Sequence, residues 1–174
     1  MKMHADKIFM QPPPISDELF LKVRTDTETL YKTITKVMCP YLKQEVFFNV
    51  EGLEHMKFKE WNKERVRADQ YFRLKFFYLV PEVLKHSHTL QGKWETKGWE
   101  RLKSHGSWVK VMKSVTFYEF VAVMGKIRIK IILKQVDSGQ INFSSVIPFW
   151  HMKELETLEP KRKRLLHDGN PESD

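Results

Sequence analysis

Cysteine is almost missing from this chain of 174 residues, in which Cys39 is the only one. A single thiol cannot close an internal disulfide, and a zinc site built from several cysteines is excluded. Cys39 lies in the apolar segment 36–40, so we expect it to be buried rather than to act as a nucleophile. The near absence of cysteine fits a reducing compartment such as the cytoplasm.

Long apolar runs and cofactor motifs are also absent. No run of about 18 apolar residues occurs, so no membrane span is expected. The first eleven residues are too polar for a secretory signal, which predicts a cytoplasmic protein. Phosphate-loop glycine patterns are lacking, and the pair His86 and His88 has no third metal ligand that spacing identifies. We therefore predict no metal and no other cofactor.

Positive charge is in excess, with 30 Lys and Arg against 22 Asp and Glu and a formal net charge of +8. Such an excess attracts polyanions, of which nucleic acid is the commonest in a cytoplasm. Hydrophobic residues make up 41% of the chain, which is enough to build a core and argues against general disorder.

The length predicts one domain between two polar ends. We expect a flexible lead over residues 1–15 that ends near three prolines, and a single domain over 16–150. Residues 151–174 contain a run of Lys and Arg and are expected to form a basic, largely disordered tail.

Helices precede hairpins in the predicted order of elements. The predicted helical segments are 17–38, 53–58, 62–79 and a further turn at 81–85. The predicted strands are 45–50, 109–113, 115–123, 127–134 and 141–148, while 87–106 is expected to be a long loop or a ragged hairpin. This order predicts an α+β fold, with N-terminal helices packed on one face of a roughly four-stranded antiparallel sheet.

The segment 127–134 alternates between apolar and mostly basic residues. Successive side chains of a strand point to opposite faces, so one face would carry isoleucines and leucine. Arg128 and Lys130 would then project from the other face, which we expect to be open.

Several imidazole and guanidinium groups suit the cleavage of RNA. RNA is cut when its 2′-hydroxyl attacks the neighbouring phosphate, which requires a base and an acid, and histidine titrates in the right range for either role. Arginine stabilises the charge that develops on phosphorus. His55 follows the first predicted strand, and Arg65 and Arg73 lie eight positions apart on nearly one face of a helix. Each of these side chains also has a plain structural interpretation, as a helix cap or as part of a solvated face.

Four motifs follow one another in an order typical of one nuclease family. They are Asn49-x-x-Gly52-x-x-His55, the spaced pair Arg65 and Arg73, and the strands Ile127-Arg128-Ile129-Lys130 and Ser144-Ser145-Val146. The part of the chain from about 45 to 148 thereby resembles the phage and mobile-element nucleases of the barnase–EndoU–colicin–RelE-like class.

The resemblance implies a metal-independent endoribonuclease that leaves a 2′,3′-cyclic phosphate. Such an enzyme would act as a toxin or as an effector of a phage or mobile element, and its partners would be RNA and a cognate antitoxin or immunity protein. The implied catalytic residues are His55 and Glu119 as proton carriers, with Arg65, Arg73, Arg128 and Ser145 around the phosphate. The residues expected to contact RNA are Lys130, Arg67, Lys59 and Trp94.

Two other functions use the same basic surface. A non-catalytic nucleic-acid-binding protein, such as a phage regulator, needs the cations but no placed acid or base. A subunit whose basic face binds an acidic protein also needs the cations and no placed acid or base.

Overall fold

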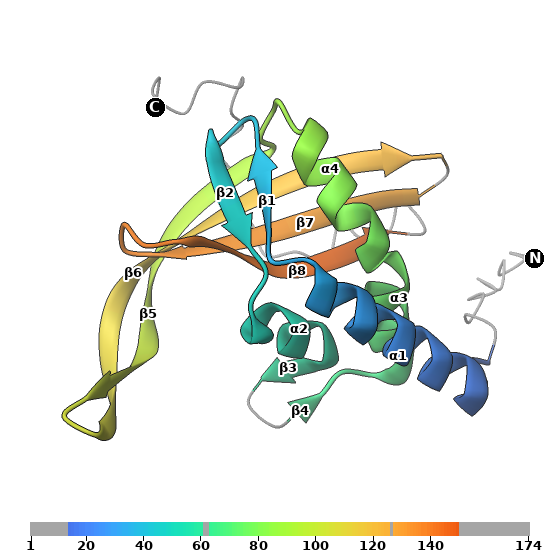
Figure 1. Ribbon diagram of the computed structural model, residues 1–174, viewed down its shortest axis with the longest axis horizontal. Coiled ribbons are helices and arrows are strands. Elements are labelled where there is room, and N and C mark those ends of the chain that lie inside the picture. The colour runs from blue at the N-terminus through green and yellow to red at the C-terminus, as the bar shows by residue number, and fades with distance from the viewer. Residues whose placement is uncertain (1–13, 61–62, 126, 150–174) are drawn as a thin grey trace, which may run out of the picture.

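The computed structural model describes residues 14–60, 63–125 and 127–149 of the chain. Residues 1–13 of the expected lead and the whole expected tail, 151–174, lie outside the described residues. The described part is an α+β fold in which helices pack with a mixed, mostly antiparallel sheet of six strands, as Figure 1 shows. No helix in it is long and apolar enough to cross a membrane.

The elements follow one another as helix, hairpin, helices and a long meander. The helices are α1 (Asp17–Thr33), α2 (Val50–Lys57), α3 (Arg67–Phe76), a 3-10 turn (Phe77–Leu79) and α4 (Val80–His86). The strands are β1 (Lys36–Cys39), β2 (Gln44–Phe47), β3 (Phe58–Glu60), β4 (Lys63–Glu64), β5 (Gly92–Ser104), β6 (Ser107–Met124), β7 (Ile127–Val136) and β8 (Ile141–Phe149). The main sheet has the order β1-β2-β8-β7-β6-β5, and only the β2–β8 pairing is parallel.

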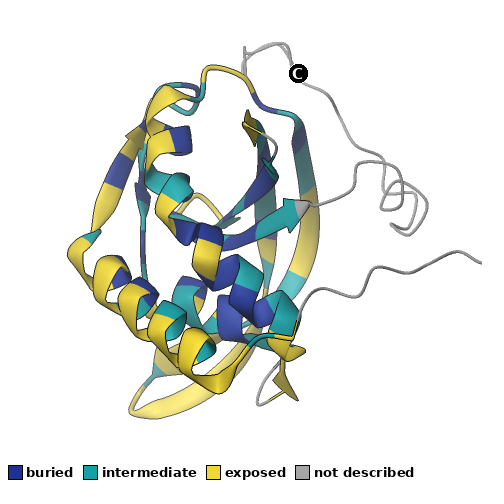
Figure 2. Ribbon diagram, turned by 90° about the vertical axis from the view of Figure 1, so that its right-hand side faces the viewer, coloured by how far each residue is buried: buried dark blue, intermediate teal, exposed yellow. Residues whose placement is uncertain are grey.

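The first helix begins as predicted but ends earlier. Ser16 caps α1, because its side chain accepts a hydrogen bond of 3.2 Å from the backbone N–H of Leu19. The prediction that this helix continues to 38 is wrong, since the chain turns extended at Ile34 and enters β1. The β-branched run 33–35 favours that change, and pairing with β2 supplies the backbone partners. Figure 2 shows that α1 keeps a largely exposed outer side.

The sheet is wider than the four strands expected from the sequence. The hairpin β1–β2 adds two strands at one edge. At the other edge the segment expected to be a loop or ragged hairpin forms the 13-residue strand β5, which pairs with β6 along its full length. Only the part of β6 from Val115 onward pairs with β7, so residues 97–114 project from the sheet as a two-stranded ribbon, which we call the arm.

The alternation expected in β7 is confirmed on its apolar side. Ile129, Ile131 and Leu133 are fully buried against the helices and the β1–β2 hairpin. The expectation that the other side is open is wrong at Lys130, which is only 5% exposed and pairs with a carboxylate of β6. Cys39 is fully buried, as predicted, and burial raises the pKa of its thiol.

An extra residue in β8 changes which side chains face the core. Ile132 lies opposite Ser145 and Leu133 lies opposite Phe143, so Ser144 is the unpaired residue of a β-bulge. Phe143 therefore faces the core with Leu133, while Ser145 faces the other side with Ile132. The bulge brings a hydroxyl to the side of the sheet opposite the core.

Helix α2 packs unusually close to β8. Asn49 caps this helix by accepting a 3.1 Å hydrogen bond from Gly52, and Tyr31 of α1 donates a 2.7 Å hydrogen bond to the Asn49 carbonyl. A Cβ at Gly52 would lie 2.5 Å from the carbonyl oxygen of Phe143 and 2.6 Å from the Tyr31 hydroxyl. Glycine thus fixes the distance between α2 and the sheet.

Gly52→Ala is therefore expected to destabilise the fold by about 1–3 kcal/mol, since overpacking against backbone outweighs the roughly 1 kcal/mol that alanine gains in a helix. Urea unfolding measures the change. Gly98→Ala is the matched control, because the added Cβ would meet only the side-chain end of Val115 at 3.3 Å. Equal stability of the two variants would contradict this account of how α2 packs on β8.

Candidate functional site

A cavity of about 980 Å³ lies between α2, the start of α3 and the side of the sheet opposite the core. β2 pairs with β8 only at Ile141 and Asn142, and beyond that point α2 and α3 pack along the edge of β8. The helices thus form one wall, and strands β5 to β8 form the other.

Most of the residues expected from the sequence to form a site line this cavity. They are His55, Arg65, Arg73, Trp94, Glu119, Lys130 and Ser145. Each comes from a different element or connection, and these are spread over the sequence, so the fold brings them together.

Three predicted site residues do not line the cavity. Arg128 lies one step beyond Lys130 on the same side of β7, opposite Phe149 in register. Arg67 forms an ion pair with Asp17, with its guanidinium carbon 4.8 Å from the ring centre of Phe20. Lys59 is exposed in the small β3–β4 ribbon. Arg67 begins α3, but its side chain is directed to α1. Lys59 lies in a ribbon that is separate from the main sheet, and Arg128 lies on β7 beyond the residues that line the cavity.

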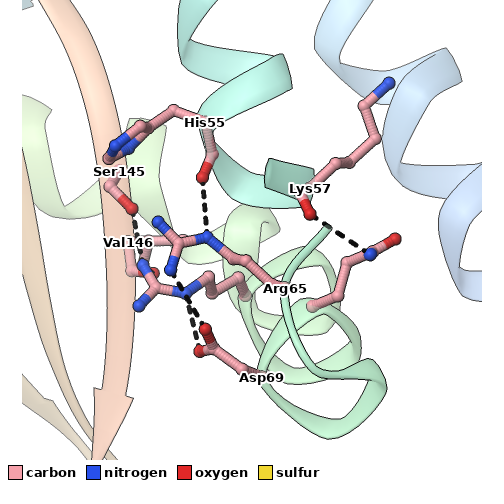
Figure 3. A network of polar contacts seen from close by, with 8 residues as sticks. His55, Lys57, Arg65, Asp69, Ser145 and Val146 are labelled. Carbon is pink, nitrogen blue, oxygen red and sulfur yellow. Dashed lines mark hydrogen bonds and ion pairs between the residues drawn. The ribbon is translucent and has the colours of Figure 1, made fainter. Parts of the chain in front are cut away.

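One carboxylate holds the two cavity arginines in place. Asp69 accepts a 3.1 Å hydrogen bond from Arg65 through one oxygen and a 2.7 Å hydrogen bond from Arg73 Nε through the other. Arg65 also donates from Nε to the His55 carbonyl over 2.9 Å, which ties the end of α2 to the start of α3 (Figure 3). The guanidinium of Arg65 is therefore fixed in orientation before any substrate binds.

Arg73 connects α3 to the bulged strand. Its NH1 group donates to the Ser145 hydroxyl over 2.7 Å and to the Val146 carbonyl over 3.2 Å. Because β2 no longer pairs with β8 at this point, the guanidinium donates to the β8 backbone a hydrogen bond that a neighbouring strand would otherwise supply. These contacts make Arg73 chiefly a residue that positions β8 and Ser145.

The imidazole of His55 sits in a positively charged surrounding. His55 is exposed as a whole residue, but its ring lines the cavity. Loss of hydration there lowers the pKa of His55, the charges of Arg65, Arg73 and Lys134 lower it further, and a backbone hydrogen bond with Ser144 acts in the opposite direction. The pKa thus lies below the ordinary histidine value, so the neutral imidazole, which accepts a proton, prevails at neutral pH.

The sheet wall carries paired charges. Lys130 Nζ lies 3.3 Å from Glu119 Oε1, and both side chains are 6% exposed. Further along β7, Lys134 pairs with Glu100 of the arm over 2.7 Å. A proton donor and an acceptor therefore adjoin each other inside the cavity.

An aromatic pair lines the cavity at its arm end. Trp94 and Phe117 are register partners on β5 and β6, and their rings stack at 5.3 Å with an interplanar angle of 18°. Both line the cavity, with Thr96 beside them. A flat apolar wall of this kind accepts the face of a nucleobase.

Sequence reasoning missed several residues of the site, among them Asp69, Lys134 and Asn142. Asp69 was signalled by its place midway between Arg65 and Arg73, at the i,i+4 spacing of helical ion pairs. Lys134 follows Lys130 at the period of a strand and shares its side. Asn142, which accepts a 3.2 Å hydrogen bond from the Asn49 amide, carried no local signal because the contact spans 93 positions.

Within the described ranges, no three His, Cys, Asp or Glu side chains are grouped so that they could hold a metal ion. Comparison of the chain with models of known protein families, with curated proteins and with solved structures finds no match.

Proposed function

We propose that this protein is a metal-independent endoribonuclease that cleaves RNA by attack of the 2′-hydroxyl and leaves a 2′,3′-cyclic phosphate. The observation that carries the proposal is that His55 and the guanidinium of Arg65, which is fixed by Asp69 and the His55 carbonyl, line one cavity. The surrounding positive charges and the loss of hydration favour the neutral form of His55 by lowering its pKa. A neutral imidazole accepts the 2′ proton, and a fixed guanidinium stabilises the charge that develops on phosphorus.

The reaction is a transesterification within the RNA. His55 removes the proton of the 2′-hydroxyl, and the oxygen attacks the adjacent phosphorus. The bond from phosphorus to the 5′-oxygen breaks, and that oxygen takes a proton from the Glu119–Lys130 pair on the sheet wall. Arg65 is the phosphate clamp, and Ser145, oriented by Arg73, is a second contact for the phosphate.

The substrate is most simply a single strand. The Trp94–Phe117 pair offers a stacking surface only to a base that is not enclosed in a duplex. RNA is required because the 2′-hydroxyl is the nucleophile. In a cytoplasm this activity would need an antitoxin or immunity protein, for which the cavity mouth is the natural target.

The test is to incubate total RNA with the purified protein in excess chelator and to analyse the end groups of the fragments. We expect cleavage with 2′,3′-cyclic phosphate and 5′-hydroxyl ends, and uncut DNA of the same sequence. Cleavage that requires magnesium, or other end groups, would refute the mechanism. Binding without cleavage would support the non-catalytic nucleic-acid-binding protein instead.

Arg65→Gln is expected to move the acid limb of the pH–rate profile to higher pH. In the wild type this limb should lie below the ordinary histidine value near 6.5, because positive neighbours disfavour the imidazolium of His55. Removing the Arg65 charge favours the imidazolium, so the pKa of His55 rises. The pH dependence of kcat/KM measures it, and Arg65→Lys, which keeps the charge, should leave the limb in place. An unmoved limb in Arg65→Gln would exclude His55 as the titrating base.

A further inference from the structure

The arm is a two-stranded ribbon that the rest of the sheet does not cover. Among the described residues, 97–104 pair with 107–114, and the register runs from Lys97 opposite Ser114 to Ser104 opposite Ser107. At the base of the arm, Ser114 also forms hydrogen bonds with Asp137. Figure 1 shows it extending beyond the ends of β7 and β8. Most of its side chains are exposed, and the ion pairs of Glu100 with Lys134 and of Lys113 with Asp137 lie on the face that continues the cavity wall.

One face of the arm combines aromatic rings with cations. Alternate residues share a face, so the side chains on the face opposite the cavity wall form one set, the outer arm face. It comprises Lys97, Trp99, Arg101, Lys103, Trp108, Lys110 and Met112. Trp99 is 65% exposed and Trp108 is 68% exposed, and the set contains no Asp or Glu.

This arrangement is unfavourable for the isolated protein. Large apolar side chains that are exposed together mark an interaction surface. A partner that is flat and apolar in parts and negatively charged would cover these rings and match the cations around them.

Unpaired nucleotides have these properties, because each offers a flat base and a phosphate. Four strand positions separate Trp99 from the level of Trp108, or about 13 Å, which spans two to three nucleotides of a single strand. Lys103 lies opposite Trp108, so a cation stands beside the ring on which a base would stack. A duplex hides its bases in the stack and would leave both rings unused.

We infer that the outer arm face binds single-stranded RNA outside the cavity and thereby selects long, unpaired substrates. The choice of RNA over DNA rests on the proposed ribonuclease function. The stacking and charge argument for a single strand stands without it.

The test measures binding of a fluorescent 2′-O-methyl RNA of ten nucleotides, which cannot be cleaved. Trp99→Ala/Trp108→Ala should weaken binding about tenfold or more, because each stacked base contributes substantially. Trp99→Phe/Trp108→Phe should retain most of it. Leu21→Ala/Tyr78→Ala is the matched control, since both positions are exposed apolar residues outside the arm, and it should bind as the wild type does.

The charges are tested in the same assay. Lys103→Ala/Lys110→Ala should reduce the salt dependence of binding, whereas Lys32→Ala/Lys85→Ala, which removes two exposed lysines from α1 and α4, should not. Unchanged affinity in the tryptophan pair, or an equal loss in both control pairs, would overturn the inference. The inference would also be overturned if the tryptophan pair lost binding to anionic vesicles or to an acidic protein while its binding to RNA stayed intact.

Cleavage assays separate this inference from the proposed function. The tryptophan pair should slow cleavage of a long single strand but leave cleavage of a dinucleotide unchanged, since a dinucleotide fills only the cavity. A protein that cleaves nothing, yet loses RNA affinity in the arm variants, would refute the ribonuclease and keep the arm as a binding surface.

Discussion

His55→Gln is expected to lower the rate of RNA cleavage by about 10²–10⁴-fold, the range typical for loss of a positioned proton carrier. Glutamine keeps a polar side chain of similar reach and suits a helix, so α2 and its hydrogen bond from Arg65 to the backbone at 55 should persist. Glutamine cannot take up a proton near neutral pH. Single-turnover cleavage of a short RNA measures the chemical step directly.

His86→Gln is the matched control for this substitution. His86 lies at the end of α4, is exposed and contacts Glu82, and it does not line the cavity. We expect the wild-type rate. A His55→Gln protein that melts like the wild type and cleaves at full rate would remove histidine from the mechanism.

Arg73→Met is expected to destabilise the fold by about 1–3 kcal/mol, the cost of leaving a buried hydrogen-bonding group without its partner. The substitution leaves the buried Ser145 hydroxyl and the buried Val146 carbonyl without their donor. Asp69 keeps Arg65 as a partner and is partly exposed, so it adds little to the loss. Urea unfolding in the absence of RNA measures the free energy of unfolding.

Arg67→Met tests whether any arginine of this helix would give the same result. Its ion pair with Asp17 is solvent-exposed, so its loss should cost only about 0–1 kcal/mol. If Arg73→Met cost no more than that, the description of Arg73 as the residue that holds the edge of β8 would be wrong.

The fold class could be predicted because it depends on local signals. The serine cap and acidic first turn fixed the start of α1, and the alternation in β7 identified its buried side. The end of α1 could not be placed, because the pairing with β2 that completes the change to extended backbone is not visible in the sequence of this segment. The strand β5 could not be predicted either, because pairing with β6 makes it a strand while its own glycine-rich sequence does not favour one.

The candidate site could be predicted as a set of residues but not as a geometry. Helical spacing related Arg65 to Arg73, yet only the structure shows that Arg73 is occupied by β8 while Arg65 faces the cavity. The period of a strand placed Arg128 and Lys130 on the same side of β7. The helices that pack beside β8 determine where the cavity ends along β7, and the sequence of β7 does not show this. The burial of Lys130 beside Glu119 follows from cross-strand register, which one strand's sequence does not contain.

The bulge at Ser144 decides which side chains of β8 face the cavity. If β8 kept all its residues but paired with β7 without the bulge, the segment after Ser144 would shift by one place and exchange its two sides. Val146 would then line the cavity and Ser145 would enter the apolar core. Deleting Ser144 itself leaves Ser145 opposite Ile132 and Val146 opposite Ile131, so a chain that lacks this one residue should keep the same cavity lining.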